Sequence, residues 1–310
     1  MLRYLGRRAL YALPVIVGVG LITFLLIRLT PGDPVRVMLG NTATPDSIAF
    51  WREYYRLDDP IWVQFLSYVG RVFSLNFGNS IQMRAPVSVI VFPRLLVSLS
   101  LILYIVLIAL LIAVPLAVYS AVKANRTPDH VVKTAMMLSF AMPAFWVGIT
   151  FVQIFAIRLG WFPASGTREG FFPYLWSLTL PAITGGLFLA PVLIRTLRVS
   201  MIESLHAEHV EAARARGLSE WTVLTRYVLR TSLITTATVL GVSIGSLIGG
   251  TVIIENVFNL PGLGKLVVTS VGGRDFPLIE AVVLLIGVIV VTVSLTVDLV
   301  NFSLDPRIRR

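Results

Sequence analysis

Apolar residues along this chain form long runs that are separated by shorter polar segments. A helix needs about 20 consecutive apolar residues to cross the hydrocarbon core of a membrane. Runs of this kind are found at about residues 9–29, 95–119, 131–157, 175–197, 232–254 and 278–302. The pattern therefore predicts an all-α integral membrane protein with six transmembrane helices.

The composition supports the same class of protein. Hydrophobic residues make up 56% of the 310 residues and charged residues only 14%, which is too few polar side chains to cover a soluble domain. Arg3, Arg7 and Arg8 precede the first run, as in a signal peptide, but the run is too long and no cleavage site of small residues follows. We expect residues 1–29 to be a cytoplasmic N-terminus and a retained first helix.

Basic residues are divided unevenly between the segments that join the runs. One side holds fifteen of them: Arg3, Arg7, Arg8, Lys123, Arg126, Lys133, Arg195, Arg198, Arg214, Arg216, Arg226, Arg230, Arg307, Arg309 and Arg310. The other side holds four: Arg158, Arg168, Lys265 and Arg274. Because short basic loops stay in the cytoplasm, both termini, the loop 198–231 and the tail 303–310 are predicted to be cytoplasmic. Orientation explains the net charge of +10 better than nucleic-acid binding, because the arginines flank apolar runs without interleaved aromatic residues.

Residues 30–94 are predicted to form a small extracytoplasmic subdomain between the first two helices. The segment is too long for a hairpin connector and carries apolar side chains at helical spacing, namely Trp62, Phe65, Leu66, Val69 and Phe73. This spacing predicts an amphipathic helix that lies on the membrane or on neighbouring protein. A purely structural cap is the alternative. Residues 95–302 then form a core of five helices.

Prolines and glycines within the runs predict kinks and close helix crossings. They are Pro14, Pro115, Pro143, Pro181 and Pro191, with Gly241, Gly245 and Gly249 at four-residue spacing. Such features are typical of a bundle around a path that opens and closes, and they also occur in rigid membrane proteins. Thr127-Pro128-Asp129 is interpreted as the N-cap, first-turn proline and acidic first turn of the third span.

Residues that carry chemistry are scarce in the predicted spans. Glu280 and Asp298 lie near the two ends of the sixth run, whereas a proton relay needs ionisable groups deep in the membrane. This disfavours a proton-coupled carrier, and a hydrolase is disfavoured because its serine would need a nearby base. Cysteine is absent, which excludes disulfides and thiolate metal sites. We therefore predict no catalytic residue and no cofactor in this chain.

Two short patterns approach ligand-binding motifs without meeting their requirements. His206 and His209 could share a helix face near Glu211, but they do not form the His-Glu-x-x-His pattern of a zinc site, and we predict no bound metal. Residues 262–265 lack both the earlier glycine and the following Ser or Thr of a phosphate-binding loop. Any energy from nucleotide hydrolysis must therefore come from another subunit.

One polar segment between the fourth and fifth runs favours a helix. Residues 205–216 contain many good helix formers and no proline. Gly217 can adopt the left-handed conformation that ends a helix, Leu218 can pack across the bend, and Ser219 can cap the next helix. The segment therefore predicts a helix-turn-helix on the cytoplasmic face.

The same segment carries residues suited to docking. Ala212 and Ala213 would let another backbone come close, and Glu211 could pair with a basic group of a partner. The alternative is a solvated connector in which Glu211 pairs with Arg214 three residues later.

The Glu211-Ala212-Ala213 segment with Gly217 belongs to a set of motifs that extends nearly from end to end of the chain. The others are Thr30-Pro31-Gly32-Asp33-Pro34, Leu57-Asp58-Asp59-Pro60-Ile61-Trp62-Val63-Gln64-Phe65, Phe77-Gly78-Asn79-Ser80, Glu255-Asn256-Val257-Phe258-Asn259-Leu260-Pro261-Gly262-Leu263-Gly264, Arg274-Asp275-Phe276-Pro277 and Leu304-Asp305-Pro306-Arg307. Together they resemble the dipeptide/oligopeptide/nickel branch of ATP-binding-cassette importer permeases. Two positions depart from the expected pattern. The general signature ends in Leu-Pro, where this chain has Leu229-Arg230 as this branch often does, and Asn76 replaces an acidic residue.

The resemblance implies a non-catalytic, multi-pass permease subunit of the bacterial cytoplasmic (inner) membrane. Its implied partners are a homologous second permease, two ATPase subunits that bind ATP and Mg, and an extracytoplasmic substrate-binding protein, with no nucleic acid. The resemblance assigns coupling to the ATPases to Glu211, Ala212, Ala213, Gly217 and Leu218. Dipeptides, longer peptides, glutathione, nickel chelates and haem are all conceivable substrates for this branch.

A second hypothesis concerns the segment 256–265, whose prolines and glycines predict a compact turn at the outer mouth. Asn259, Leu260, Pro261 and Gly262 would contact the binding protein there, unless the turn packs only on its own subunit. Two further functions stay open, a stand-alone secondary carrier and a structural subunit of another membrane complex.

Overall fold

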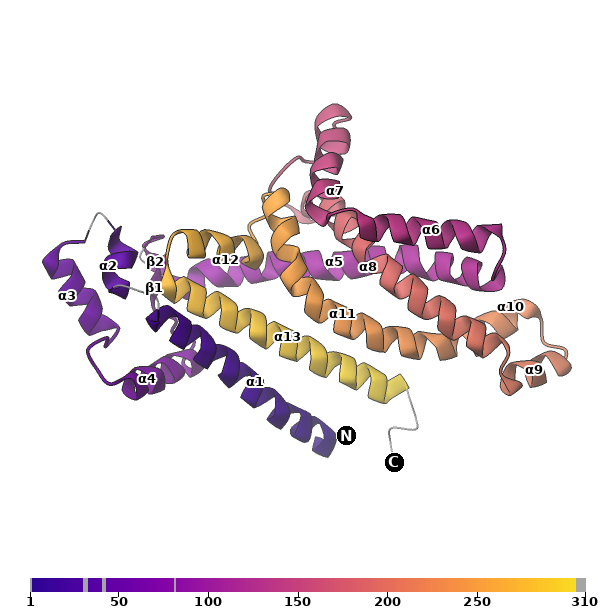
Figure 1. Cartoon of the computed structure of the whole chain (residues 1–310), viewed down its shortest axis with the longest axis horizontal. Coiled ribbons are helices and arrows are strands. Elements are labelled where there is room, and N and C mark those ends of the chain that lie inside the picture. The colour runs from indigo at the N-terminus through magenta and orange to yellow at the C-terminus, as the bar shows by residue number, and fades with distance from the viewer. Residues whose placement is uncertain (1, 30–32, 41–42, 81, 305–310) are drawn as a thin grey trace. The chain divides into compact units, whose positions relative to one another are not determined.

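The computed structural model describes residues 2–29, 33–40, 43–80 and 82–304, and most of these residues are helical (Figure 1). They form two compact units, one made of residues 2–98 and 261–292 and the other of residues 99–260 and 293–304. Residues 30–32 and 305–310, which carry parts of two motifs and most of the predicted tail, lie outside the described residues. The side chains of Arg3, Arg7, Arg8 and Asp298 also lie outside the described set.

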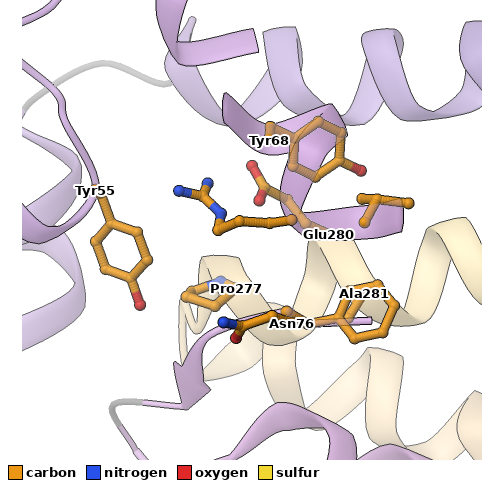
Figure 2. A pocket seen from close by; sticks show the side chains of 9 residues that line it. Tyr55, Tyr68, Asn76, Pro277, Glu280 and Ala281 are labelled. Atoms are coloured by element: carbon orange, nitrogen blue, oxygen red, sulfur yellow. The ribbon is translucent and has the colours of Figure 1, made fainter. Parts of the chain in front are cut away.

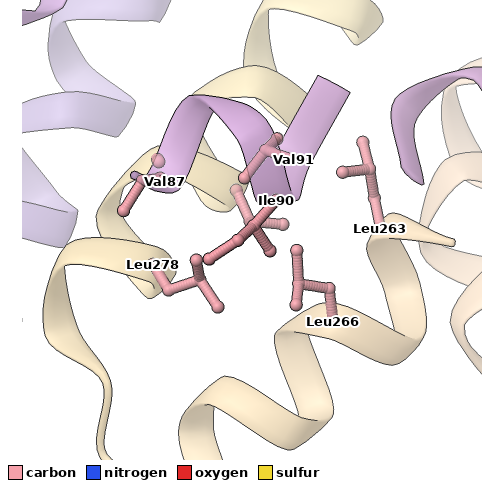
Figure 3. Close-up of a cluster of buried hydrophobic side chains, with 8 residues drawn as sticks. Val87, Ile90, Val91, Leu263, Leu266 and Leu278 are labelled. Atoms are coloured by element: carbon pink, nitrogen blue, oxygen red, sulfur yellow. The ribbon is translucent and has the colours of Figure 1, made fainter. Parts of the chain in front are cut away.

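The first unit joins the N-terminal part of the chain to residues near its C-terminal end. Its elements are α1 (Leu2–Arg28), α2 (Pro34–Leu39), α3 (Pro45–Tyr54), α4 (Ile61–Phe73), β1 (Asn79–Ser80), β2 (Ala85–Pro86), the start of α5 (Val87–Val122), α12 (Leu263–Gly272) and most of α13 (Phe276–Leu304). The two short strands pair antiparallel. A buried cluster connects the start of α5 to α12 and α13 (Figure 3), and its members include Val87, Ile90, Val91, Leu263, Leu266 and Leu278.

Local sequence explains where the short helices before α4 begin. Asp33 accepts a hydrogen bond from the backbone N–H of Val35 at 3.1 Å, which caps α2. Thr44 and Ser47 form a reciprocal capping box at the start of α3. Both helices carry proline in the first turn, where its missing N–H costs nothing. These caps fix the segment between α1 and α4 without a large core.

The amphipathic helix that was predicted around Trp62 is α4, and its apolar face points outward. Gln64 and Tyr68 are buried, whereas Trp62, Leu66 and Phe73 are 65%, 65% and 81% exposed. A helix on the surface of a soluble protein has the opposite arrangement. The exposed face therefore suits an apolar environment, as the prediction requires.

The second unit is built around α8. Its elements are the rest of α5, α6 (Thr127–Ala141), α7 (Ala144–Phe151), η2 (Val152–Arg158), α8 (Phe171–Leu205), α9 (Glu208–Ala215), α10 (Glu220–Thr222), η3 (Val223–Leu229), α11 (Arg230–Val257) and the end of α13. Helices α6, α7 and α11 all pack against α8. The apolar stretch of α8 is 72% buried, against 22–33% for the other long apolar helices, so α8 is the central helix of this unit.

The described residues contain four helices that are long and apolar enough to cross a membrane, or five if a bent pair counts as one span. They are Val87–Val122, Phe171–Leu205, Glu220–Val257 and Phe276–Thr296. Within α1, the stretch Leu13–Leu25 is apolar. The structure thus shows a mostly helical membrane protein, while the predicted count of six spans is not confirmed.

The third predicted span is not one straight helix. Helices α6 and α7 meet at an angle of 96°, with the break at Met142 and Pro143. Proline cannot donate the backbone hydrogen bond that would continue α6, and the residue before it is pushed into an extended conformation, as Met142 is. The predicted turn at 256–265 also differs, because α12 begins at Leu263.

Close packing of α8 on α5 depends on Gly185 and Gly186. A methyl group at Gly185 would lie 2.6 Å from Cδ1 of Ile105, and one at Gly186 would lie 2.8 Å from Cγ2 of Ile108. Small residues permit such close crossings between membrane helices. Gly249, which belongs to the predicted stripe of glycines on α11, does not permit a close helix crossing within this chain. A methyl group there would meet nothing within 4 Å.

We expect Gly186→Ala to destabilise the protein and Gly249→Ala to leave its stability unchanged or slightly raised. The first substitution overpacks the α5–α8 contact, an effect that typically costs about 1–3 kcal/mol, whereas both substitutions change helix propensity equally. The measurement is the thermal unfolding midpoint of each variant in detergent. Equal midpoints for the two variants would contradict the assigned packing role of Gly186.

Candidate functional site

The polar segment after α8 forms the predicted helix-turn-helix, with a shorter first helix than expected. Helix α8 continues to Leu205, and α9 runs from Glu208 to Ala215. The two helices are separated by the non-helical residues His206 and Ala207. The predicted helix of residues 205–216 is therefore divided between the end of α8 and α9.

The end of α9 is closed by a complete Schellman motif. Gly217 has φ +78°, its N–H donates to the carbonyl of Arg214 at 2.9 Å, and the N–H of Leu218 donates to the carbonyl of Ala213 at 3.4 Å. Ser219 then accepts from the N–H of Thr222 and caps the next helix. The predicted conformation of Gly217 and the predicted cap at Ser219 are both confirmed.

The side chains of α9 divide into an inner and an outer face. Val210 and Ala213 are fully buried within the described chain, whereas Glu211 and Ala212 are exposed. Ala213 is thus an anchor of α9, and Ala212 is the small residue that remains accessible. Of the predicted coupling residues, Ala212 thus faces outward and the next residue, Ala213, faces inward.

The alternative interpretation of this segment requires an ion pair between Glu211 and Arg214, but Arg214 pairs with a different carboxylate. Arg214 binds Glu220 at the start of α10, with Nε 2.9 Å from Oε1, rather than Glu211. This bridge connects the two arms of the turn, although its exposed partners give it a small share of the stability. Among the described residues, Glu211 therefore keeps an exposed carboxylate that is not committed to Arg214.

A groove of about 600 Å³ lies next to α9. Its lining comes from the end of α5, the α5–α6 connection, the end of α8 and the α9–η3 segment: Ala121, Val122, Ala124, Arg126, Leu205, His206, Glu211, Arg214, Glu220, Trp221 and Leu224. Trp221 is 74% exposed and Glu211 lies on the same groove. The groove combines charged groups with an exposed indole, a mixture typical of protein contact surfaces.

Asp129 holds the helices beside this groove together. It has no exposed surface and accepts from Nε and Nη2 of Arg198 at 2.6 and 2.7 Å. Lys133 lies 2.9 Å away, and Ser120 donates a further hydrogen bond at 2.5 Å. The sequence predicted Asp129 only as an acidic first-turn residue, and Thr127 begins α6 rather than capping it. The carboxylate instead joins α5, α6 and α8.

A second, partly buried ion pair lies in the first unit, where α1, α4 and α13 meet. Arg28 Nη1 lies 3.2 Å from Oε1 of Glu280, and Arg28 Nε donates to Gln64 at 2.9 Å. Gln64 in turn donates to the carbonyls of Leu57 and Asp59. The sequence located Glu280 near a span end but not its partner, which is 252 residues away.

Beside this pair lies a small cavity of about 20 Å³, roughly the size of one water molecule. Figure 2 shows Tyr55, Tyr68, Asn76 and Glu280 around it. Burial raises the pKa of Tyr55 and of Tyr68 above the ordinary tyrosine value, so both hydroxyls stay protonated even in moderately alkaline solution. The cavity is too small for a transported solute.

The motifs of the outer region and of the last third meet in the first unit. Ser80 donates to Oδ2 of Asp275, and the backbone N–H of Gln82 donates to the same oxygen at 3.3 Å. Asn76, which replaces the expected acidic residue, accepts from the N–H of Gly78 at 3.2 Å and supports the turn before β1. Two motifs 195 residues apart thus form one contact.

The predicted binding-protein contact divides in the structure. Asn259 and Pro261 are exposed, whereas Leu260 and Gly262 are buried. Asn259 has φ +53°, and the N–H of Leu260 donates to the carbonyl of Glu255 at 2.8 Å, which closes the end of α11. Leu260 is therefore placed to anchor the turn, and the accessible residues are its two neighbours.

Comparison with known proteins agrees over the whole chain. Residues 113–310 match the family described as binding-protein-dependent transport system inner membrane component, and residues 1–102 match its N-terminal membrane component. The glutathione transport system permease protein GsiC of Salmonella choleraesuis is 37% identical over 310 residues, which are 100% of this chain and 99% of that protein. GsiC of Escherichia coli is 34% identical with the same coverage.

Solved structures agree on the fold. The inward-facing MetNI methionine ABC transporter matches with a TM-score of 0.59 at 15% identity, over 70% of this chain and 96% of its own. An amino acid ABC transporter matches with a TM-score of 0.51 at 15% identity, over 68% and 92%. The chain belongs to the family of binding-protein-dependent transport system inner membrane components and is a permease subunit of an ATP-binding-cassette importer.

Proposed function

We propose that this chain forms half of the translocation pathway of an ATP-driven importer for peptides or a related small substrate. It pairs with a homologous second permease, two ATPase subunits and an extracytoplasmic binding protein in the bacterial inner membrane. The similarity to permeases named for glutathione transport supports a short peptide as substrate. The binding protein would carry most of the selectivity.

The observation that carries the coupling role is the rigid, outward-facing helix α9. Val210 and Ala213 bury its inner face, and the left-handed Gly217 closes its end. Glu211 and Ala212 stay exposed on the other face. A short helix that is held firmly and presents a small residue beside a carboxylate suits insertion into a groove of an ATPase, where the carboxylate pairs with a basic group.

The route from α9 into the membrane runs through α8. Only His206 and Ala207 separate the two helices, and Asp129 ties α8 to α5 and α6 next to this junction. Movement of the ATPases on binding ATP would therefore move several helices together, which is the requirement for switching a bundle between two packed arrangements. Hydrolysis would then reset the bundle.

The basic-residue count supports the orientation in this proposal. Both termini and the loop 198–231 would be cytoplasmic, with residues 30–94 as an outer subdomain before the core of 95–302. At the outer face, Asn259 and Pro261 would contact the binding protein, because they are the exposed members of their turn.

We expect Glu211→Arg to abolish most ATP-dependent uptake, because reversing the charge would place two basic groups against each other at the ATPase contact. The measurement is uptake into proteoliposomes that contain the whole complex, together with copurification of the ATPases. The matched control is Glu169→Arg, which reverses another exposed carboxylate far along the chain from α9. Full uptake by the Glu211 variant would rule out the coupling role.

Gly217→Val tests the geometry of α9 independently of charge. A β-branched residue at φ +78° is strained by about 1–3 kcal/mol, and we expect α9 to fray and coupling to fall. Gly249→Val on α11 is the control, because a side chain there begins in open space. ATPase activity that remains stimulated by the binding protein in the Gly217 variant would contradict the need for a fixed helix end.

Asn259→Cys tests the outer contact in a chain that has no native cysteine. We expect a bifunctional thiol–amine reagent to link this position to the substrate-loaded binding protein. Arg216→Cys, on the turn after α9, is the control and should give no such product. Absence of the product from Asn259 in every nucleotide state would leave the turn with a role only in its own subunit.

A further inference from the structure

A second groove in the unit built around α8 has a lining unlike that of the groove at α9. It has a volume of about 400 Å³ and lies between α6 and α8. Lys133, Arg195 and Arg198 provide charges, while Met136, Met137 and Phe140 provide most of the apolar wall. One side is therefore cationic and the other apolar.

The positive charge of this groove exceeds its negative charge. Arg198 and Lys133 both bind Asp129, at 2.6 and 2.9 Å, so one carboxylate faces two cations. Arg195 is exposed on α8, three residues before Arg198. No carboxylate among the described residues pairs with it. Two positive charges thus remain for a ligand, and the ligand must be an anion.

The apolar wall favours an anion that carries a hydrocarbon part. Met137 and Phe140 are 71% and 60% exposed, and they follow Lys133 by one to two helical turns toward the C-terminal end of α6. The charged groups therefore lie at one end of an exposed apolar strip. This order matches a phospholipid, with a phosphate at the cations and an acyl chain along the strip.

We propose that the groove between α6 and α8 binds an anionic phospholipid. Its phosphate is held by Arg195 and Lys133, and one acyl chain lies against Met137 and Phe140. Placement of this lipid in the cytoplasmic leaflet rests on the orientation in the proposed function. The bound lipid contacts α8 close to Arg198. It therefore lies beside the cluster around Asp129 that joins α5, α6 and α8.

The test measures lipid retained by the purified whole complex after exchange into nanodiscs of phosphatidylglycerol and phosphatidylcholine. We expect native mass spectrometry to find phosphatidylglycerol enriched, and Arg195→Gln to lower its retention about fivefold, the size expected for one basic residue at an anionic surface. Arg226→Gln, an exposed arginine on η3 outside the groove, is the control and should retain the native amount.

A second variant examines the acyl-chain strip without touching a charge. Phe140→Ser should lower retention of long-chain phosphatidylglycerol more than that of a short-chain form. Equal retention by the Arg195 and Arg226 variants would overturn the proposal. So would a crosslink from Phe140→Cys to the second permease in high yield, because a protein would then fill the groove. Retention is read without transport, so failure of coupling at Glu211 would leave this result intact.

Discussion

A carboxylate with no solvent-exposed surface joins three helices of this chain near their ends. Asp129 accepts hydrogen bonds from α5 and α8 and pairs with Lys133 on its own helix. Removal of one partner from a buried ion pair costs about 3–5 kcal/mol, because the other charge stays buried. The cluster therefore opposes separation of α5, α6 and α8, and the junction to α9 lies next to it.

The cost of leaving a charge unpaired away from water applies in both units. Charges are costly in an apolar environment, and the two strongest ion-pair networks each join residues of different helices. Arg28 and Glu280 satisfy each other between α1 and α13, and Gln64 completes the contact from α4. Gln64 turns the polar side of α4 toward Arg28, and the apolar side chains of the helix lie on its opposite, exposed face.

The sequence predicted those features that depend on a few neighbouring residues. Gly217 was predictable because a helix end that needs a left-handed residue selects glycine, and Ser219 because a cap needs a short hydroxyl side chain. The ion pairs were not predictable, because Asp129 and Arg198 are 69 residues apart and one sequence does not say which distant charges meet. Pro143 predicted a break, but the bend of 96° depends on how α6 and α7 pack on α8. The inward direction of Ala213 likewise depended on tertiary packing.

The length of α8 has a consequence for where force enters the membrane. Its 35 residues extend about 52 Å at 1.5 Å per residue, against a hydrocarbon core of about 30 Å. Membrane helices seldom tilt by more than about 40°, and even that tilt leaves a projection of about 40 Å along the membrane normal. At least about 10 Å of the helix therefore lies outside the hydrocarbon core even at that tilt, so a partner that binds its end need not enter the apolar part of the membrane.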